Sequence, residues 1–206
     1  DTRQPYILRD YRAQTIVLYP FQYNPVTKVL RVYHNITVSL KSNHQKGINE
    51  LTQTANTKSI NPEFASIYQN QFLNYQTQNS NRYNELSDLN AKLLVITHNS
   101  FSDIIQPLVD WKIRRGIPTQ VVDVATIGDE QAIRTYIADQ YHNNQITHVL
   151  LVGDAAQVPS LYSNAADGYS DVLYGCIEGN DSYPEVFIGR FSGETTAHIR
   201  TQVQRT

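Results

Sequence analysis

The stretch THVLLVGD, residues 147–154, decides the fold class of this chain. It is a short, continuous apolar run that ends in a glycine and an aspartate, and such runs are typical of strands buried on both faces of a parallel sheet. Two similar runs precede it, KLLVIT at 92–97 and TQVVDV at 119–124. Because strands that alternate with helices build a parallel sheet through right-handed crossovers, we predict an open, mostly parallel α/β sheet with flanking helices.

The segments between and after these runs carry helix signals. Residues 103–112 follow Ser102, a favoured N-cap, and end in the Arg-Arg-Gly turn at 114–116, which suits a helix C-terminus. Residues 129–141 have apolar side chains at helical spacing, and residues 195–206 predict a further helix. The functional loops of such a layer are expected at the carboxyl ends of its strands.

An acidic stretch that contains glycine lies between residues 170 and 191. Asp and Gly are depleted from strands, so we predict a loop here. Calcium takes six to eight oxygens from carboxylates and main-chain carbonyls, and glycine allows the tight backbone that brings them together. The run EGNDSYPE at 178–185 supplies such oxygens, and Asp154 is a second source. The alternative, that these acids only solvate a surface loop, stays open.

Several segments together resemble the first catalytic subdomain of the gingipain-type cysteine peptidases, which have a caspase-like fold. They are THVLLVGD at 147–154, SDVLYG at 170–175, GNDSYPEVFIGRF at 179–191 and the earlier PLVDWK at 107–112 with Arg115-Gly116. The motifs agree in order and spacing from about residue 92 onward. The resemblance implies a calcium site with side-chain ligands at Asp154, Asp181 and Glu185 and main-chain carbonyl ligands at Glu178 and Tyr183.

No residue of this chain matches the catalytic cysteine and histidine of that family. The one cysteine, Cys176, lies inside the acidic loop, and acidic neighbours oppose the thiolate that a nucleophile requires. A catalytic Cys176 paired with His142, His148 or His198 is the minor alternative. The resemblance implies a Cys/His dyad beyond residue 206, so the fragment alone is expected to be inactive.

The first 89 residues divide into two parts. Residues 1–40 contain the runs TIVLY at 15–19 and VLRVYHNITV at 29–38, which predict a β-hairpin around an Asn-Pro turn. This part resembles the end of the gingipain prodomain, which is all-β and inhibits its own enzyme. Residues 41–89 read as a polar linker with one short helix at 62–73, capped by Asn61, and residues 90–206 as the truncated first α/β subdomain.

Arg82 and Tyr83 lie in an otherwise uncharged part of this linker. They match the position where the resembled family is cleaved during activation. We interpret Arg82 as the residue before the cut, with an ordinary surface arginine as the equal alternative.

Composition excludes several classes of function. A formal net charge of -2 leaves no electrostatic footprint for nucleic acid, and no apolar run has bilayer-spanning length. The resemblance implies a secreted or cell-surface bacterial cysteine endopeptidase made as a zymogen. Its expected partners are the remainder of the catalytic domain and of the prodomain, and protein or peptide substrates. The alternative function is a scaffold or secretion-associated module that keeps the α/β layer without proteolysis.

Overall fold

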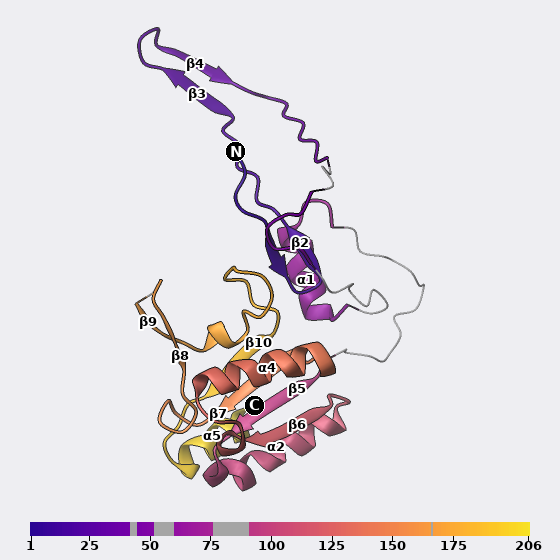
Figure 1. Ribbon diagram of the computed structural model, residues 1–206, viewed down its shortest axis with the longest axis vertical. Coiled ribbons are helices and arrows are strands. Elements are labelled where there is room, and N and C mark those ends of the chain that lie inside the picture. Colours follow the sequence, from indigo (N-terminus) through magenta and orange to yellow (C-terminus); the bar gives the residue numbers. More distant parts are fainter. Residues whose placement is uncertain (42–44, 52–59, 76–90, 166) are drawn as a thin grey trace.

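The second half of the chain is an α/β layer (Figure 1). The computed structural model describes residues 1–41, 45–51, 60–75, 91–165 and 167–206. Four parallel strands form a sheet in the order β10-β7-β5-β6. These strands are β5 (Leu93–Thr97), β6 (Thr119–Asp123), β7 (His148–Val152) and β10 (Phe187–Phe191). The predicted open parallel sheet is confirmed.

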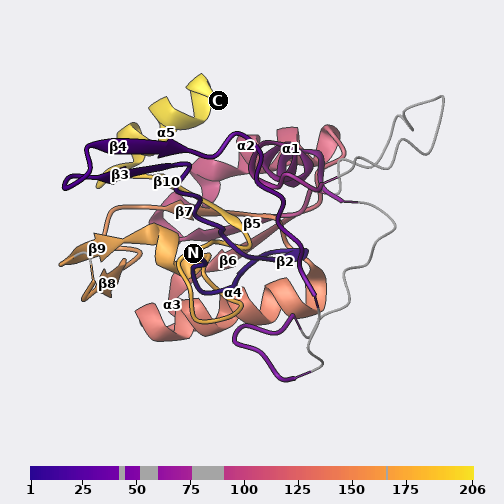
Figure 2. The same ribbon diagram turned by 90° about the horizontal axis from the view of Figure 1, so that it is seen from above.

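Helices cover both faces of this sheet (Figure 2). Helix α4 (Glu130–Asn144) packs on one face, while α2 (Ser102–Arg114) and α5 (Thr196–Arg205) pack on the other. Alternate residues of a strand point to opposite faces, so β5 contributes Leu94 and Ile96 to the α4 side and Val95 to the α2 side. None of the helices in the described part of the chain has the length and apolar character needed to span a membrane.

The N-cap predicted for α2 is wrong. Ser102 lies inside the helix, because a 3-10 turn, η1 (Asn99–Phe101), runs directly into it. The side chain that caps this combined start is His98, whose Nδ1 accepts from the backbone N–H of Ser100 at 3.3 Å.

Short elements that the sequence patterns did not indicate lie between the main ones. They are α3 (Val124–Ile127), the hairpin of β8 (Leu161–Ser163) with β9 (Gly168–Ser170), and the 3-10 turn η2 (Asp171–Tyr174).

The N-terminal half holds two small antiparallel hairpins and one helix. The first hairpin joins β1 (Tyr6–Leu8) to β2 (Tyr11–Ala13), and the second joins β3 (Phe21–Asn24) to β4 (Val29–Val32). In Figure 1 the β3–β4 ribbon extends away from the α/β layer. Helix α1 (Pro62–Gln71) follows the cap predicted at Asn61, whose side chain accepts from the N–H groups of Glu63 and Phe64.

The strand expected at residues 15–19 is wrong. These residues contribute only an isolated bridge between Thr2 and Ile16. The side chain of Asn24 accepts from the backbone N–H groups of Val26 and Thr27, and this turn sets a register in which residues 21–24 face residues 29–32.

Arg190 ties the loops at the carboxyl edge of the sheet to β10. Its guanidinium donates to both carboxylate oxygens of Asp171 at 2.7 Å, and to the carbonyls of Gly153 at 2.9 Å and Val158 at 2.8 Å. Burial alone would raise the pKa of Asp171, but the hydrogen bonds from Arg190 and Ser160 outweigh it and hold that pKa below its usual value. A planar, bidentate donor is therefore required here.

We expect Arg190→Ala to lower the free energy of unfolding by about 3 kcal/mol, because among the described residues it leaves the Asp171 carboxylate with only the Ser160 hydroxyl as donor and removes the donor to two carbonyls. Urea denaturation followed by circular dichroism measures this loss. The exposed Arg200 on α5 provides the control, and Arg200→Ala should change stability by less than about 0.5 kcal/mol. Equal effects of the two substitutions would show that the hydrogen bonds of Arg190 add no more to the free energy of unfolding than an exposed arginine does.

Candidate metal site and docking surface at the amino edge of the sheet

The acidic loop ends at the amino-terminal edge of the sheet, directly before β10. The N–H of Glu185 donates to the carbonyl of Gly175 at 2.8 Å. A Cβ added at Gly175 would lie only 2.8 Å from the carbonyl oxygen of Val186, so glycine is needed for this close approach. The two ends of the loop are thus held together, and Glu185 is directed inward.

Glu185 is fully buried, at 0% exposure. Its Oε2 accepts from the backbone N–H groups of Ile177 at 2.8 Å and Glu178 at 3.0 Å, while Oε1 has no hydrogen-bond partner among the described residues. Burial raises the pKa of the Glu185 carboxyl to about 7, although those hydrogen bonds oppose the rise. A buried oxygen without a partner is costly, so this carboxyl calls for a proton or a cation.

Glu178 contributes a second carboxylate to the same region. Its Oε1 is buried and makes no hydrogen bond among the described residues, and lies 3.6 Å from Nδ1 of His142. Two carboxylate oxygens of this loop, one on Glu178 and one on Glu185, are therefore left with unused acceptor capacity.

Asp181 turns toward the N-terminal segment of the chain. Its Oδ2 accepts from the backbone N–H of Ile7 at 2.9 Å and from Nδ2 of Asn49 at 3.3 Å, and its Oδ1 accepts from the N–H of Tyr183 at 3.0 Å. The ring of Tyr6 stacks on that of Tyr183 with centroids 4.0 Å apart. This carboxylate therefore joins the acidic loop to β1.

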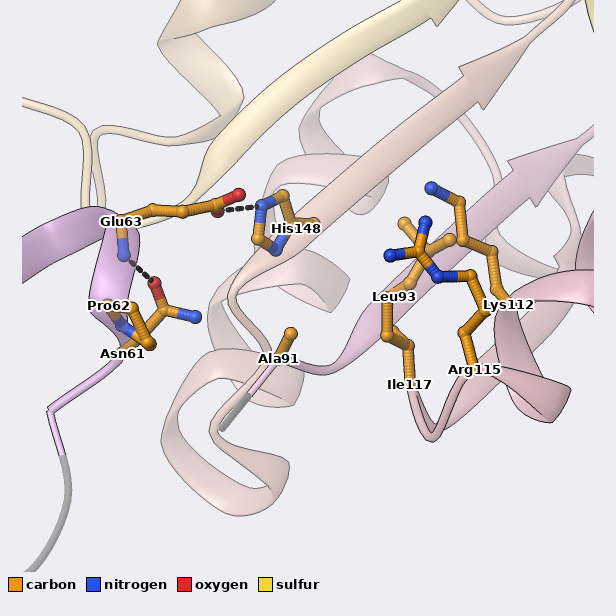
Figure 3. A pocket seen from close by; sticks show the side chains of 9 residues that line it. All are labelled: Asn61, Pro62, Glu63, Ala91, Leu93, Lys112, Arg115, Ile117 and His148. Atoms are coloured by element: carbon orange, nitrogen blue, oxygen red, sulfur yellow. Dashed lines mark hydrogen bonds and ion pairs between the residues drawn. The ribbon is translucent and has the colours of Figure 1, made fainter. Parts of the chain in front are cut away.

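Helix α1 contacts the neighbouring start of β7. Oε2 of Glu63 lies 2.6 Å from Nε2 of His148, and the ring of Phe64 packs 4.5 Å from that of Phe187. Figure 3 shows the Glu63–His148 pair on one side of a cavity of about 290 Å³, with Lys112 and Arg115 on the other side. The amino edge of the sheet is thus covered by both β1 and α1.

The structure does not bring Asp154 to the acidic loop. Phe187, at the start of β10, pairs with His148, and Phe191, at its end, pairs with Val152. Asp154 follows β7 at the carboxyl edge, where its Oδ1 accepts from the hydroxyl of Ser192 at 3.0 Å. Glu185 precedes β10 at the opposite edge, so the length of a five-residue strand separates the two carboxylates.

Only part of the expected ligand set could therefore bind the same cation. Glu178, Asp181 and Glu185 share one loop, and the two oxygens with unused capacity are buried there. Within the described residues no group of three or more His, Cys, Asp or Glu side chains is arranged to hold a metal ion. Any ion at this edge would need main-chain carbonyls, as the expected contributions of Glu178 and Tyr183 require.

Cys176 lies beside the same carboxylates. Burial raises the pKa of its thiol, and the charges of Glu185 and Asp181 raise it further. Its Sγ contacts the carbonyl oxygen of Val172 at 3.7 Å. A thiol held in its neutral form in this way is a poor nucleophile.

Two family models divide the chain between them. Residues 86–206 match the model of Peptidase family C25, and residues 1–81 match the model Propeptide_C25. The chain belongs to peptidase family C25. The propeptide match includes β1 to β4 and α1, so the contacts at the amino edge join the propeptide part of this C25 chain to its peptidase part.

Curated relatives in the C25 family come from Porphyromonas gingivalis. Gingipain R2 is 38% identical over 98% of this chain, and gingipain R1 is 39% identical over the same share. Lys-gingipain is 24% identical over 96% of the chain. The C25 chain described here spans 27% of gingipain R2, 20% of gingipain R1 and 12% of Lys-gingipain.

Two solved structures resemble the fold of this C25 chain. The crystal structure of the Arg specific cysteine proteinase gingipain R (RGPB) is 37% identical, with a TM-score of 0.54 over 60% of this chain and 30% of that one. The complex of Porphyromonas gingivalis RgpB pro- and mature domains is 38% identical, with a TM-score of 0.53 over 56% of this chain and 28% of that one. The gingipain resemblance of the sequence motifs is confirmed.

We expect His148 to reduce the free energy of unfolding as the pH falls below about 6.5. Burial lowers the pKa of His148 from its usual value of 6.5, although Glu63 opposes this. The folded state therefore favours neutral His148, and this stabilisation is present above pH 6.5 and lost as the pH falls toward the lowered pKa. Urea denaturation of the wild-type chain and of His148→Gln, between pH 7.5 and 5.5, measures this loss as a change in the difference between their free energies of unfolding.

His148→Gln is the matched control, because an amide can donate to Glu63 and does not titrate. The stability of wild type relative to this variant should therefore decrease between pH 7.5 and 5.5, because only the wild-type chain has to protonate residue 148. A relative stability of wild type that increases as the pH falls would contradict the assigned sign.

Proposed function

We propose that this chain is the N-terminal portion of a gingipain-like cysteine endopeptidase zymogen, with the end of the prodomain docked on the first catalytic subdomain. The observation that carries the proposal is the set of contacts at the amino edge of the sheet. Asp181 binds the backbone of β1, and His148 binds Glu63 of α1, so two elements of the propeptide match are held by the peptidase match.

In this proposal the nucleophile and its base lie outside residues 1–206. Peptide-bond hydrolysis would proceed by attack of a thiolate on the peptide carbonyl, with histidine as acid and base. The neutral, buried Cys176 does not suit that role, and its chain contributes scaffold and docking surface. By the same resemblance we expect secretion or attachment at the bacterial surface, and protein or peptide substrates.

We further propose that the acidic loop holds a structural calcium ion. Support comes from the unused buried oxygens of Glu178 and Glu185 and from a nearby third carboxylate at Asp181. The carbonyls of Glu178 and Tyr183 remain part of the expected ligand set. Calcium would replace the proton on Glu185 and supply a positive charge that compensates the burial of these acids.

Calcium should raise the melting temperature of metal-stripped protein, because a ligand that binds only the folded state stabilises it by mass action. The stabilisation at calcium 100-fold above its dissociation constant is about 2.7 kcal/mol. Since binding requires the ionised form of a carboxyl with a pKa of about 7, the apparent calcium affinity should fall as the pH decreases below 7. Calorimetric melting at several pH values measures both effects.

Glu185→Gln should abolish the calcium response, and Asp154→Asn should keep it, since Asp154 lies at the other edge of the sheet. This pair of variants distinguishes an ion held by the acidic loop alone from an ion that also requires Asp154, as the family resemblance implies. A calcium response that is lost in Asp154→Asn and kept in Glu185→Gln would contradict the placement of the ion in the loop.

We also propose that activation cuts the chain between Arg82 and Tyr83. Both residues lie outside the described residues, so the support comes from the sequence. The propeptide match ends at residue 81 and the peptidase match begins at residue 86, and the proposed cut falls between these limits.

N-terminal sequencing of the mature protein should therefore give Tyr83 as its first residue. Arg82→Ala should block this cut if the processing enzyme requires arginine before the cut. A mature protein that begins at a different residue in both forms would refute the assignment.

A further inference from the structure

Arg9 occupies the turn between β1 and β2 in a conformation that arginine rarely adopts. Its φ of 46° lies in the left-handed region, where residues other than glycine, asparagine and aspartate are uncommon. Such a turn is ordinarily built with glycine or asparagine. From this turn the Arg9 side chain reaches the segments that precede β7 and β10.

The guanidinium of Arg9 donates hydrogen bonds to two main-chain carbonyls. One terminal nitrogen, Nη1, donates to the carbonyl oxygen of Glu185 at 2.7 Å and to that of Ile146 at 3.1 Å. Ile146 comes shortly before β7 and Glu185 comes shortly before β10, and these two strands are neighbours in the sheet. The pairing of β7 with β10 therefore brings these two carbonyls together at the amino edge of the sheet, where both accept from the same nitrogen of Arg9.

Aromatic rings and buried acids complete the surroundings. The guanidinium carbon of Arg9 lies 5.3 Å from the ring centroid of Tyr141 and 4.9 Å from that of Phe64. Burial raises the pKa of Tyr141, and the charges of Glu185 and Glu178 raise it further while Arg9 opposes them. The site thus combines carbonyl acceptors, an aromatic face and a negative field, which are the features that bind a guanidinium.

The walls of this site belong to different parts of the chain. Ile146, Glu185 and Tyr141 lie within the peptidase match, whereas Arg9 and Phe64 lie within the propeptide match. After a cut between the two matches, the carbonyl pair and the Tyr141 ring would therefore stay with the peptidase part.

We propose that the main-chain carbonyls of Ile146 and Glu185 and the ring of Tyr141 form an arginine-binding clamp that recognises Arg9 and so docks the prodomain. The ligand class is an arginine side chain on an extended peptide segment. This proposal rests on the proposed zymogen function, because Arg9 is taken as part of a prodomain that docks and later leaves.

Lysine does not satisfy the same clamp. Its ammonium is a strongly hydrated point charge, whereas a guanidinium is planar, weakly hydrated and able to stack on aromatic rings while it donates in its plane. A comparison of a guanidinium with an ammonium at this position therefore tests the clamp.

The test compares the wild-type chain with Arg9→Ala, Arg9→Lys and the control Arg31→Ala, which removes an exposed arginine on β4. Hydrogen exchange at the amides of α1 and β1 reports docking, and exchange at β5 and β7 reports whether the sheet remains folded. We expect at least a tenfold loss of protection at α1 and β1 in both Arg9 variants, an unchanged sheet, and no effect of Arg31→Ala.

Chemical rescue identifies the ligand class. Millimolar methylguanidinium should restore α1 protection in Arg9→Ala, while methylammonium and urea at the same concentration should not. Protection that is unchanged in Arg9→Ala, or restored equally by methylammonium, would overturn the clamp. The absence of α1 protection in the wild-type chain would overturn the docking of the prodomain as well, so the two failures can be told apart.

The processed protein offers a second readout. With its catalytic thiol alkylated, it should bind a peptide of residues 6–11, YILRDY, at least tenfold more tightly than the same peptide with citrulline in place of Arg9. Citrulline keeps the shape of arginine and removes its charge. Equal binding of the two peptides would overturn the role of the guanidinium even where docking itself is intact.

Discussion

The buried carboxyl of Glu185 is the constraint on which the amino edge of the sheet depends. Its Oε2 holds the loop through two backbone N–H groups, its main-chain N–H joins the loop to Gly175, and its carbonyl receives Arg9. A single residue thus connects the folding of the loop, the unused oxygen that favours a cation, and the docking of β1. A substitution here removes the side-chain contacts directly and reaches the main-chain contacts only if the loop moves, which is why the calcium response and the docking need separate measurements.

Local sequence patterns predicted the elements of the layer well. The apolar runs predicted β5, β6 and β7, and Asn61 caps α1 as predicted because an N-cap depends only on residues within one turn. Asp129, which the helical spacing places at the first position of the helix, is instead the N-cap of α4. The predicted N-cap at Ser102 failed because the preceding 3-10 turn satisfies the start of α2 instead. The strand at residues 15–19 failed because the turn, and not β-propensity, sets the register of a hairpin.

The sequence indicates the acidic loop of the candidate site but not the contacts that dock β1 and α1. The acids of the loop stand out in the sequence because they are contiguous, and their role as ligands stays a prediction. The expected ligand set also includes Asp154, which the topology places at the other edge of the sheet. The partners of Arg9 lie 137 and 176 residues away, and Glu63 meets His148 only through the docking of α1. No local periodicity encodes such contacts, so the docking surface could be found only in three dimensions.

The side of the sheet on which β1 and α1 lie has a consequence for the proposed zymogen. In open α/β layers ligands bind at the carboxyl ends of the strands, whereas β1 and α1 pack at the amino ends. An occupant at one end does not exclude a molecule from the other. If the chain works as the zymogen proposed above, the contacts at Arg9, Asp181 and His148 leave the carboxyl edge free, and any direct blockade of a substrate cleft at that edge would have to come from a different stretch of the propeptide.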